Sequence, residues 1–139
     1  MDFFEDLINL FLPSNCIYCG VAGSSICIDC SRKLNLKPRL VSRAGINGFA
    51  SCEYEMKISK LVNAFKESGQ TSLARVMSPP MTEALANFDL KEVALIPMPS
   101  KRESFSARGF EPATVLARSV ARHLAKRQKV LLPVQNTVS

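Results

Sequence analysis

Two cysteine pairs stand close together in the stretch Cys16-Ile17-Tyr18-Cys19-Gly20-Val21-Ala22-Gly23-Ser24-Ser25-Ile26-Cys27-Ile28-Asp29-Cys30. Each Cys-x-x-Cys pair presents two sulfurs from one tight turn, and Gly20 permits the positive φ that lets backbone N–H groups point at sulfur. Two such pairs form a closed tetrahedral set of thiolates, which is typical of structural zinc. The spacing therefore predicts one structural Zn2+ bound by Cys16, Cys19, Cys27 and Cys30, with iron or disulfide bonds as the alternatives.

The sequence before these cysteines carries no sign of a targeting segment. It begins Met1-Asp2-Phe3-Phe4-Glu5-Asp6, which is acidic where a secretory signal would be basic. The apolar run that follows stops at Pro13, short of the roughly 20 residues that a membrane-spanning helix needs. We therefore expect a cytoplasmic protein with no membrane span, in which thiols stay reduced and available to a metal.

The chain divides, on this reading, into a small metal module and a larger domain. We expect the first domain over residues 1–37, with an amphipathic helix over 2–12 followed by the four-cysteine zinc module, and the second over 38–139. A segment of about thirty residues is too short to build enough core, so the metal would supply its stability. Cys52 stands apart in a predicted strand and receives no role, since such a cysteine is most often a small buried hydrophobic side chain.

Strand and helix patterns alternate in the first half of the larger domain. Aromatic and β-compatible residues predict a strand over 46–55, and apolar residues at helical spacing predict a helix over 56–68 that ends at Gly69. A second helical region covers 71–88. The Pro79-Pro80 pair predicts a break or a kink in this region, and we expect two pieces.

The same alternation continues toward the end of the chain. Val93–Ile96 is a short continuous apolar run, typical of a strand buried on both faces in a parallel sheet. A polar basic loop is expected over 101–110, and Pro112 suits the first turn of a helix to about Gln128. Another strand is expected over 130–134. This order predicts an α/β fold with a parallel sheet.

Basic and hydroxyl side chains follow the apolar run, at the point where a parallel sheet binds ligands. They are Ser100, Lys101, Arg102 and Arg108. Loop N–H groups and a following helix N-terminus favour anions, and Lys and Arg add charge-assisted donors. These residues form our predicted phosphate-binding site. The alternative is a solvated basic loop in a chain whose net charge is +6.

Several segments, taken in order, resemble elements of the ComF family, whose members are phosphoribosyltransferase-like and linked to competence and DNA uptake. The segments are Leu10-Phe11-Leu12-Pro13 with the first cysteine pair, Phe65-Lys66-Glu67-Ser68-Gly69, Ile96-Pro97-Met98-Pro99, Arg108-Gly109-Phe110 and Leu116-Ala117-Arg118. Thr137 is similar to the family's threonine after the next strand.

The resemblance implies a fold and a ligand. The fold is a small zinc-ribbon-like module followed by a partial type I phosphoribosyltransferase-like parallel sheet with helices. Enzymes of that type bind 5-phosphoribosyl-1-diphosphate with Mg2+. By the same resemblance, Pro97–Lys101 would lie near the pyrophosphate, and Arg102 and Arg108 would lie on a mobile flap.

The sequence departs from the family pattern at two places. The family's Arg-Gly-Phe-Asn-Gln is here Arg108-Gly109-Phe110-Glu111-Pro112, which puts a carboxylate beside the proposed phosphate site. No strand is followed by an acidic pair and a Thr-Thr-Gly turn, the family's loop for the phosphoribosyl diphosphate. We therefore expect a truncated or inactive homologue with no assigned catalytic residue. Mg2+ and 5-phosphoribosyl-1-diphosphate would be bound only if activity is retained.

The alternative function is a non-enzymatic, zinc-containing adaptor in DNA uptake. It would bind single-stranded DNA or a competence protein through its basic surface, with Tyr18 and Phe110 available to stack on bases. Salt-sensitive DNA binding would distinguish the two readings.

Overall fold

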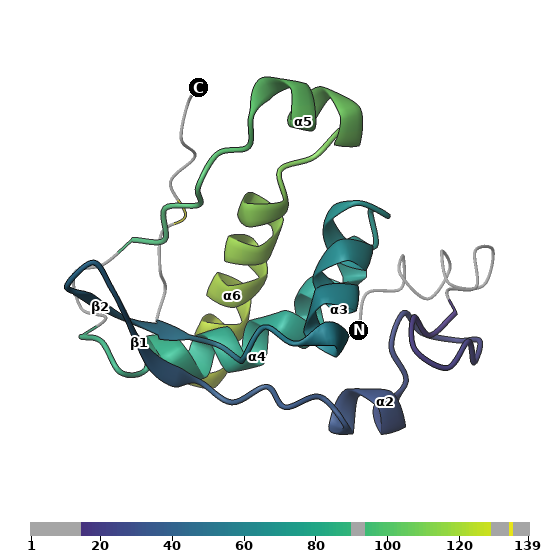
Figure 1. Ribbon diagram of the computed structural model, residues 1–139, viewed down its shortest axis with the longest axis horizontal. Helices are drawn as coiled ribbons and strands as arrows, with labels where there is room; N and C mark the ends of the chain where they lie inside the picture. Colours follow the sequence, from purple (N-terminus) through teal and green to yellow (C-terminus); the bar gives the residue numbers. More distant parts are fainter. Residues whose placement is uncertain (1–14, 90–93, 129–133, 135–139) are drawn as a thin grey trace.

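The computed structural model of the chain describes residues 15–89, 94–128 and 134. In chain order the elements are α2 (Ile28–Arg32), β1 (Arg39–Arg43), β2 (Ile46–Ala50), α3 (Met56–Lys66), the 3-10 helix η1 (Thr71–Leu73), α4 (Ala74–Leu85), α5 (Arg102–Arg108) and α6 (Pro112–Gln128). Figure 1 shows α3, α4 and α6 between the β1–β2 hairpin at one end and the four-cysteine segment at the other. The helix predicted over 2–12 lies outside the described residues.

β1 and β2 form an antiparallel hairpin with Arg43 paired to Ile46. The two residues between them, Ala44 and Gly45, have φ of 51° and 77°. Two successive positive φ values give a tight hairpin turn whose twist matches that of the strands. The strand predicted over 46–55 is thus present as Ile46–Ala50, whereas its partner β1 was not predicted.

α3 confirms the helix predicted over 56–68. It buries Ile58, Leu61, Ala64 and Phe65, whose spacing places them on one face. Gly69 follows the helix with φ +66°, a conformation that L side chains rarely adopt. The buried face of α3 packs with Leu34, Leu73 and Ala74 to form the main hydrophobic cluster.

α4 is one helix, so the prediction that the prolines divide this region was wrong. η1 leads into Ala74–Leu85, and both Pro79 and Pro80 lie inside that helix. Pro79 has no N–H to donate to the carbonyl of Arg75, one turn earlier. The hydroxyl of Ser78 points to that carbonyl instead, at 3.4 Å, so the acceptor remains partnered.

α4 and α6 pack closely through small polar side chains. The Ser119 hydroxyl of α6 lies 3.3 Å from the carbonyl oxygen of Ala74 and 3.2 Å from the hydroxyl of Ser78, and its one hydrogen can be donated to either. Further along, Val120 and Leu124 are buried and form a second cluster. The helix predicted to start at Pro112, with an apolar stripe through these two residues, is confirmed.

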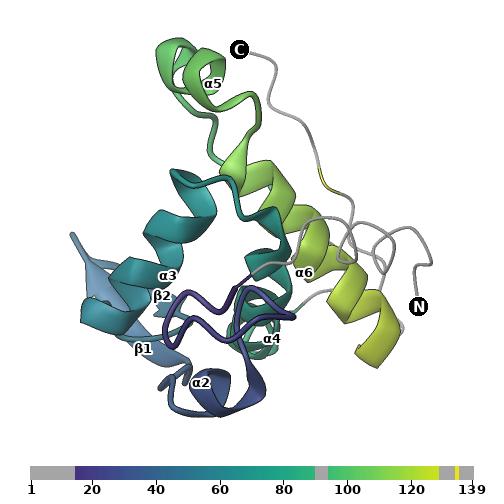
Figure 2. The same cartoon turned by 90° about the vertical axis from the view of Figure 1, so that its right-hand side faces the viewer.

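α5 replaces the basic loop expected over 101–110. Its first turn is closed by the N–H of Phe105, which donates to the carbonyl of Lys101 at 3.0 Å. Gly109 ends the helix in the left-handed conformation, with φ 74°. Figure 2 shows α5 standing apart from α3, α4 and α6. The helix escaped prediction because an exposed helix of seven residues has no apolar periodicity to reveal it.

The described residues make a mixed helix and strand fold in which the predicted parallel sheet is not shown. Leu95 forms an isolated parallel bridge with Val134, and the two-stranded sheet is antiparallel. Val93 and residues 130–133 of the predicted strands lie outside the described part. The division at residues 37 and 38 stays a prediction. Within the described ranges, no helix is long and apolar enough to cross a membrane.

Candidate metal centre and basic pocket

The four cysteines predicted to bind zinc come together in space. The sulfurs of Cys16, Cys19, Cys27 and Cys30 all lie within 4.8 Å of one another. The sulfurs of Cys19 and Cys27 are 3.7 Å apart, far longer than the roughly 2 Å of a disulfide bond. A tetrahedral zinc ion with Zn–S bonds of about 2.3 Å has sulfurs separated by about 3.8 Å. The cluster could therefore bind a metal such as zinc.

Local hydrogen bonds build each half of the cluster. Around the first pair, the N–H of Gly20 donates to the carbonyl of Cys16 at 2.8 Å, and the N–H of Cys16 donates to Val21 at 2.8 Å. Gly20 has φ +78°, as the sequence predicted. The second pair lies at the start of α2, where Cys27 is the N-terminal cap and Cys30 falls within the helix. The turn that carries Cys16 and Cys19 thus faces the start of α2, which carries Cys27 and Cys30.

The pKa values of Cys16 and Cys30 are shifted in opposite directions. Burial would raise the pKa of Cys16, but backbone N–H groups of Cys19, Cys27 and Tyr18 and the Cys19 thiol bring it down to about 6. The pKa of Cys30 is raised to about 12, first by its hydrogen bond with the Cys27 thiol and then by burial. The backbone therefore favours a thiolate at Cys16, whereas a metal cation must displace the proton at Cys30.

The cysteine segment is anchored to the helical body by its own side chains. Tyr18 donates its hydroxyl to the carbonyl of Lys57 at 2.6 Å, and the ammonium of Lys60 lies 5.7 Å from the centre of the Tyr18 ring. The hydroxyls of Ser25 and Ser72 are 2.7 Å apart. The metal cluster is thus tied to the start of α3 and to η1.

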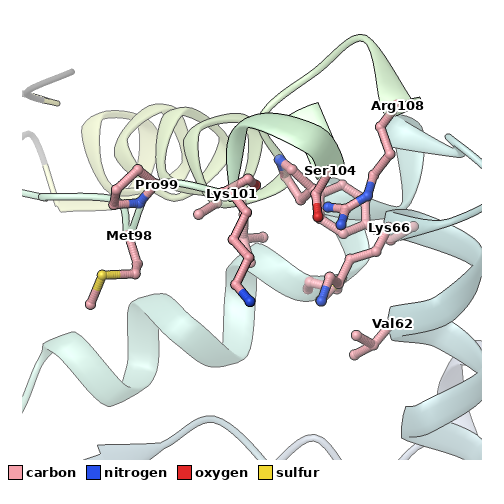
Figure 3. A pocket seen from close by; sticks show the side chains of 13 residues that line it. Val62, Lys66, Met98, Pro99, Lys101, Ser104 and Arg108 are labelled. Carbon is pink, nitrogen blue, oxygen red and sulfur yellow. The ribbon is translucent and has the colours of Figure 1, made fainter. Parts of the chain in front are cut away.

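A basic pocket of about 510 Å³ opens on the other side of α3. It lies between α3, α4, the segment before α5, α5 itself and the start of α6. The lining residues are Val62, Phe65, Lys66, Met77, Met98, Pro99, Ser100, Lys101, Ser104, Arg108, Pro112, Ala113 and Leu116. Figure 3 shows the side chains of Lys66 and Lys101 extending into the same space, with Arg108 beside them.

Three of the four residues proposed to bind phosphate line this pocket, namely Ser100, Lys101 and Arg108. Arg102 is exposed on α5 and is not among the lining residues. Sequence reasoning missed Lys66 and Ser104 as site residues. Lys66 belongs to the segment Phe65-Lys66-Glu67-Ser68-Gly69 that carries part of the ComF resemblance, and this segment was the available signal.

Two carboxylates already neutralise part of the pocket. The Nε of Arg108 lies 3.6 Å from a carboxylate oxygen of Glu67. The backbone N–H of Ser100 donates to Oε2 of Glu111 at 3.1 Å. Glu111 directly precedes α6, where the positive end of the helix dipole favours a negative charge. Glu111, which departs from the family pattern, therefore accepts a hydrogen bond from the backbone N–H of Ser100 at the edge of the pocket.

The remaining residues singled out in the sequence contact the protein itself. The ring of Phe110 packs edge-on against Phe65, with centroids 6.3 Å apart, and Tyr18 is bound to α3 as described. Cys52 is half-buried and lines a small cavity of about 190 Å³. Burial, then the charge of Glu55, raise the pKa of Cys52, which favours the protonated thiol at neutral pH.

No protein-family model, curated protein or solved structure that was compared with this chain matches it. The assignment of both sites therefore rests on their own geometry.

Proposed function

We propose that this protein is a zinc-stabilised binding protein for a phosphate-bearing ligand, a ComF-like phosphoribosyltransferase homologue that lacks the phosphoribosyl diphosphate-binding loop. The observation that carries the proposal is the convergence of Lys66, Lys101 and Arg108 on one pocket. They come from α3, from the residue before α5 and from the end of α5. Cationic side chains that are distant in the sequence but are held close together by the fold, despite their mutual repulsion, are typical of an anion-binding site.

The pocket offers several kinds of donor to a phosphate group. The two ammonium groups and the guanidinium supply charge-assisted hydrogen bonds, which are stronger than neutral ones. The hydroxyls of Ser100 and Ser104 can donate as well. The start of α6 adds the partial positive charge of a 17-residue helix.

The metal, in this proposal, is zinc in a structural role. Four thiolates close its coordination sphere and leave no position for substrate. Within residues 15–89, 94–128 and 134, the cysteines are the one group of three or more His, Cys, Asp or Glu side chains placed to hold an ion. Mg2+ would therefore have to enter on the ligand's own phosphates.

Titration calorimetry with inorganic phosphate tests the proposal on the zinc-loaded chain. We expect weak binding that falls about tenfold in Lys66→Gln and in Lys101→Gln, because each loses a charge-assisted hydrogen bond. Lys57→Gln is the matched control, since Lys57 is an exposed lysine on the same helix outside the pocket. No binding by the parent protein, or an equal loss in the control, would contradict the proposal.

The adaptor reading, with single-stranded DNA or a competence protein as partner, remains the alternative. Tyr18 and Phe110, the aromatic residues on which stacking depended, already contact Lys60 and Phe65. A steep fall of DNA affinity with salt would favour this alternative over the pocket.

A further inference from the structure

The basic pocket has an apolar floor that a bare phosphate would leave in water. Val62, Met77 and Leu116 line it beneath the cations, and Met98 lines it from the segment before α5. Met98 is 80% exposed, although covering a methionine side chain with apolar surface is energetically favourable. A ligand that carries an apolar ring next to its anionic group would bury this surface.

The charge that is left in the pocket suits one phosphate group. Arg108 is shared with Glu67, and the amide of Ser100 is taken by Glu111. Lys66 and Lys101 then provide two positive charges against the one negative charge of Glu111, a small positive balance that suits one phosphate group better than two. A diphosphate would bring more negative charge toward the two carboxylates and would be repelled by them.

We infer that the pocket binds a phosphate monoester carried on an apolar ring and discriminates against pyrophosphate. This inference rests on the proposed function and names the ligand class of that site. It departs from the diphosphate that the ComF resemblance implies. Met98 would cover one face of the ring, while Lys66 and Lys101 would hold the phosphate.

Calorimetry with three probes at one ionic strength tests the ligand class: phenyl phosphate, inorganic phosphate and pyrophosphate. We expect phenyl phosphate to bind about tenfold more tightly than inorganic phosphate, because its ring is removed from water. Pyrophosphate is expected to bind no more tightly than inorganic phosphate.

A pair of methionine variants isolates the apolar contact. Met98→Ala should remove most of the preference for phenyl phosphate, measured as the ratio of the affinities for phenyl phosphate and inorganic phosphate in the same variant. Met56→Ala is the matched control, because Met56 is 89% exposed and lies outside the pocket. Both side chains are exposed, so neither change is expected to lower the melting temperature.

The possible results separate the inference from the proposed function. Phosphate binding without a gain for phenyl phosphate, or with pyrophosphate as the tightest probe, overturns the inference and leaves the proposed function standing. Equal behaviour of Met98→Ala and Met56→Ala also overturns it. No binding of any probe overturns both.

Discussion

The carboxylate of Glu111 and the backbone N–H of Ser100 meet at the edge of the basic pocket, 3.1 Å apart. Ser100 itself lines the pocket, and so does Pro112, the residue after Glu111. A bound phosphate would therefore meet a negative charge where the loop could otherwise offer it a donor. At the scale of single residues, we expect Glu111 to weaken anion binding in this pocket.

Replacement of that carboxylate by an amide should strengthen phosphate binding. We expect Glu111→Gln to raise the affinity for inorganic phosphate about fivefold, since it removes one repulsive charge close to the ligand. Glu83→Gln, which removes one exposed carboxylate from α4 outside the pocket, should have little effect. Titration calorimetry of both variants decides the matter. An equal gain in both would show that only net charge matters.

The clustering of the four cysteines could be predicted from the sequence, whereas two polar residues of the basic pocket, Lys66 and Ser104, could not. The cysteines are close in the sequence, so their spacing reports their geometry directly. Lys66 joins the pocket only because α3 packs beside the segment that carries Lys101, and that contact is tertiary. Arg102 and Arg108 have the same charge, but only Arg108 lines the pocket.

At the scale of elements, α5 carries much of the pocket and depends on one glycine. Ser104 and Arg108 belong to α5, and Gly109 ends this helix with φ +74°. A Cβ at Gly109 would meet nothing within 4 Å, so any effect of adding one comes from the backbone conformation. Left-handed backbone costs an L residue roughly 1–2 kcal/mol.

Gly109→Ala should therefore loosen the end of α5 and lower phosphate affinity. We expect a loss of about 1 kcal/mol in unfolding free energy and a severalfold weaker phosphate titration. Gly48→Ala is the matched control, because Gly48 also has open space around its Cβ position but no positive φ. Denaturant unfolding and calorimetry of the two variants measure both effects. If Gly48→Ala costs as much as Gly109→Ala, the C-cap explanation is wrong.

Elements with a strong apolar face were predictable, and those without one were not. α3 and α6 follow the helical spacing of their buried residues. The hairpin strand β1 is exposed along its whole length, so no alternation marked it. α4 was predicted as two pieces because the side-chain bond from Ser78 to the carbonyl of Arg75 cannot be read from the sequence.

At the scale of the whole molecule, the cysteine segment and the helices share one hydrophobic cluster. Ile17, Tyr18 and Ile26 pack against the same buried residues as α3 and η1. A metal bound by the four cysteines would therefore hold in place a part of the core rather than an appended module. The parallel sheet could not be tested in the same way, because the described part of the chain contains one parallel bridge, between Leu95 and Val134.

The central claim is that one zinc ion keeps the cysteine segment folded on α3. Hydrogen exchange before and after chelation, with the metal content measured in parallel, tests it most directly. We predict one zinc ion per chain. Its removal should first speed exchange over residues 15–34 and at the start of α3, where Tyr18 is bonded to Lys57.

The exchange of α4 and α6 should change least, because their contact through Ser78 and Ser119 does not involve the metal. A purified chain that is folded over residues 15–34 without zinc would contradict the claim. Loss of zinc that leaves exchange in this segment unchanged would contradict it as well.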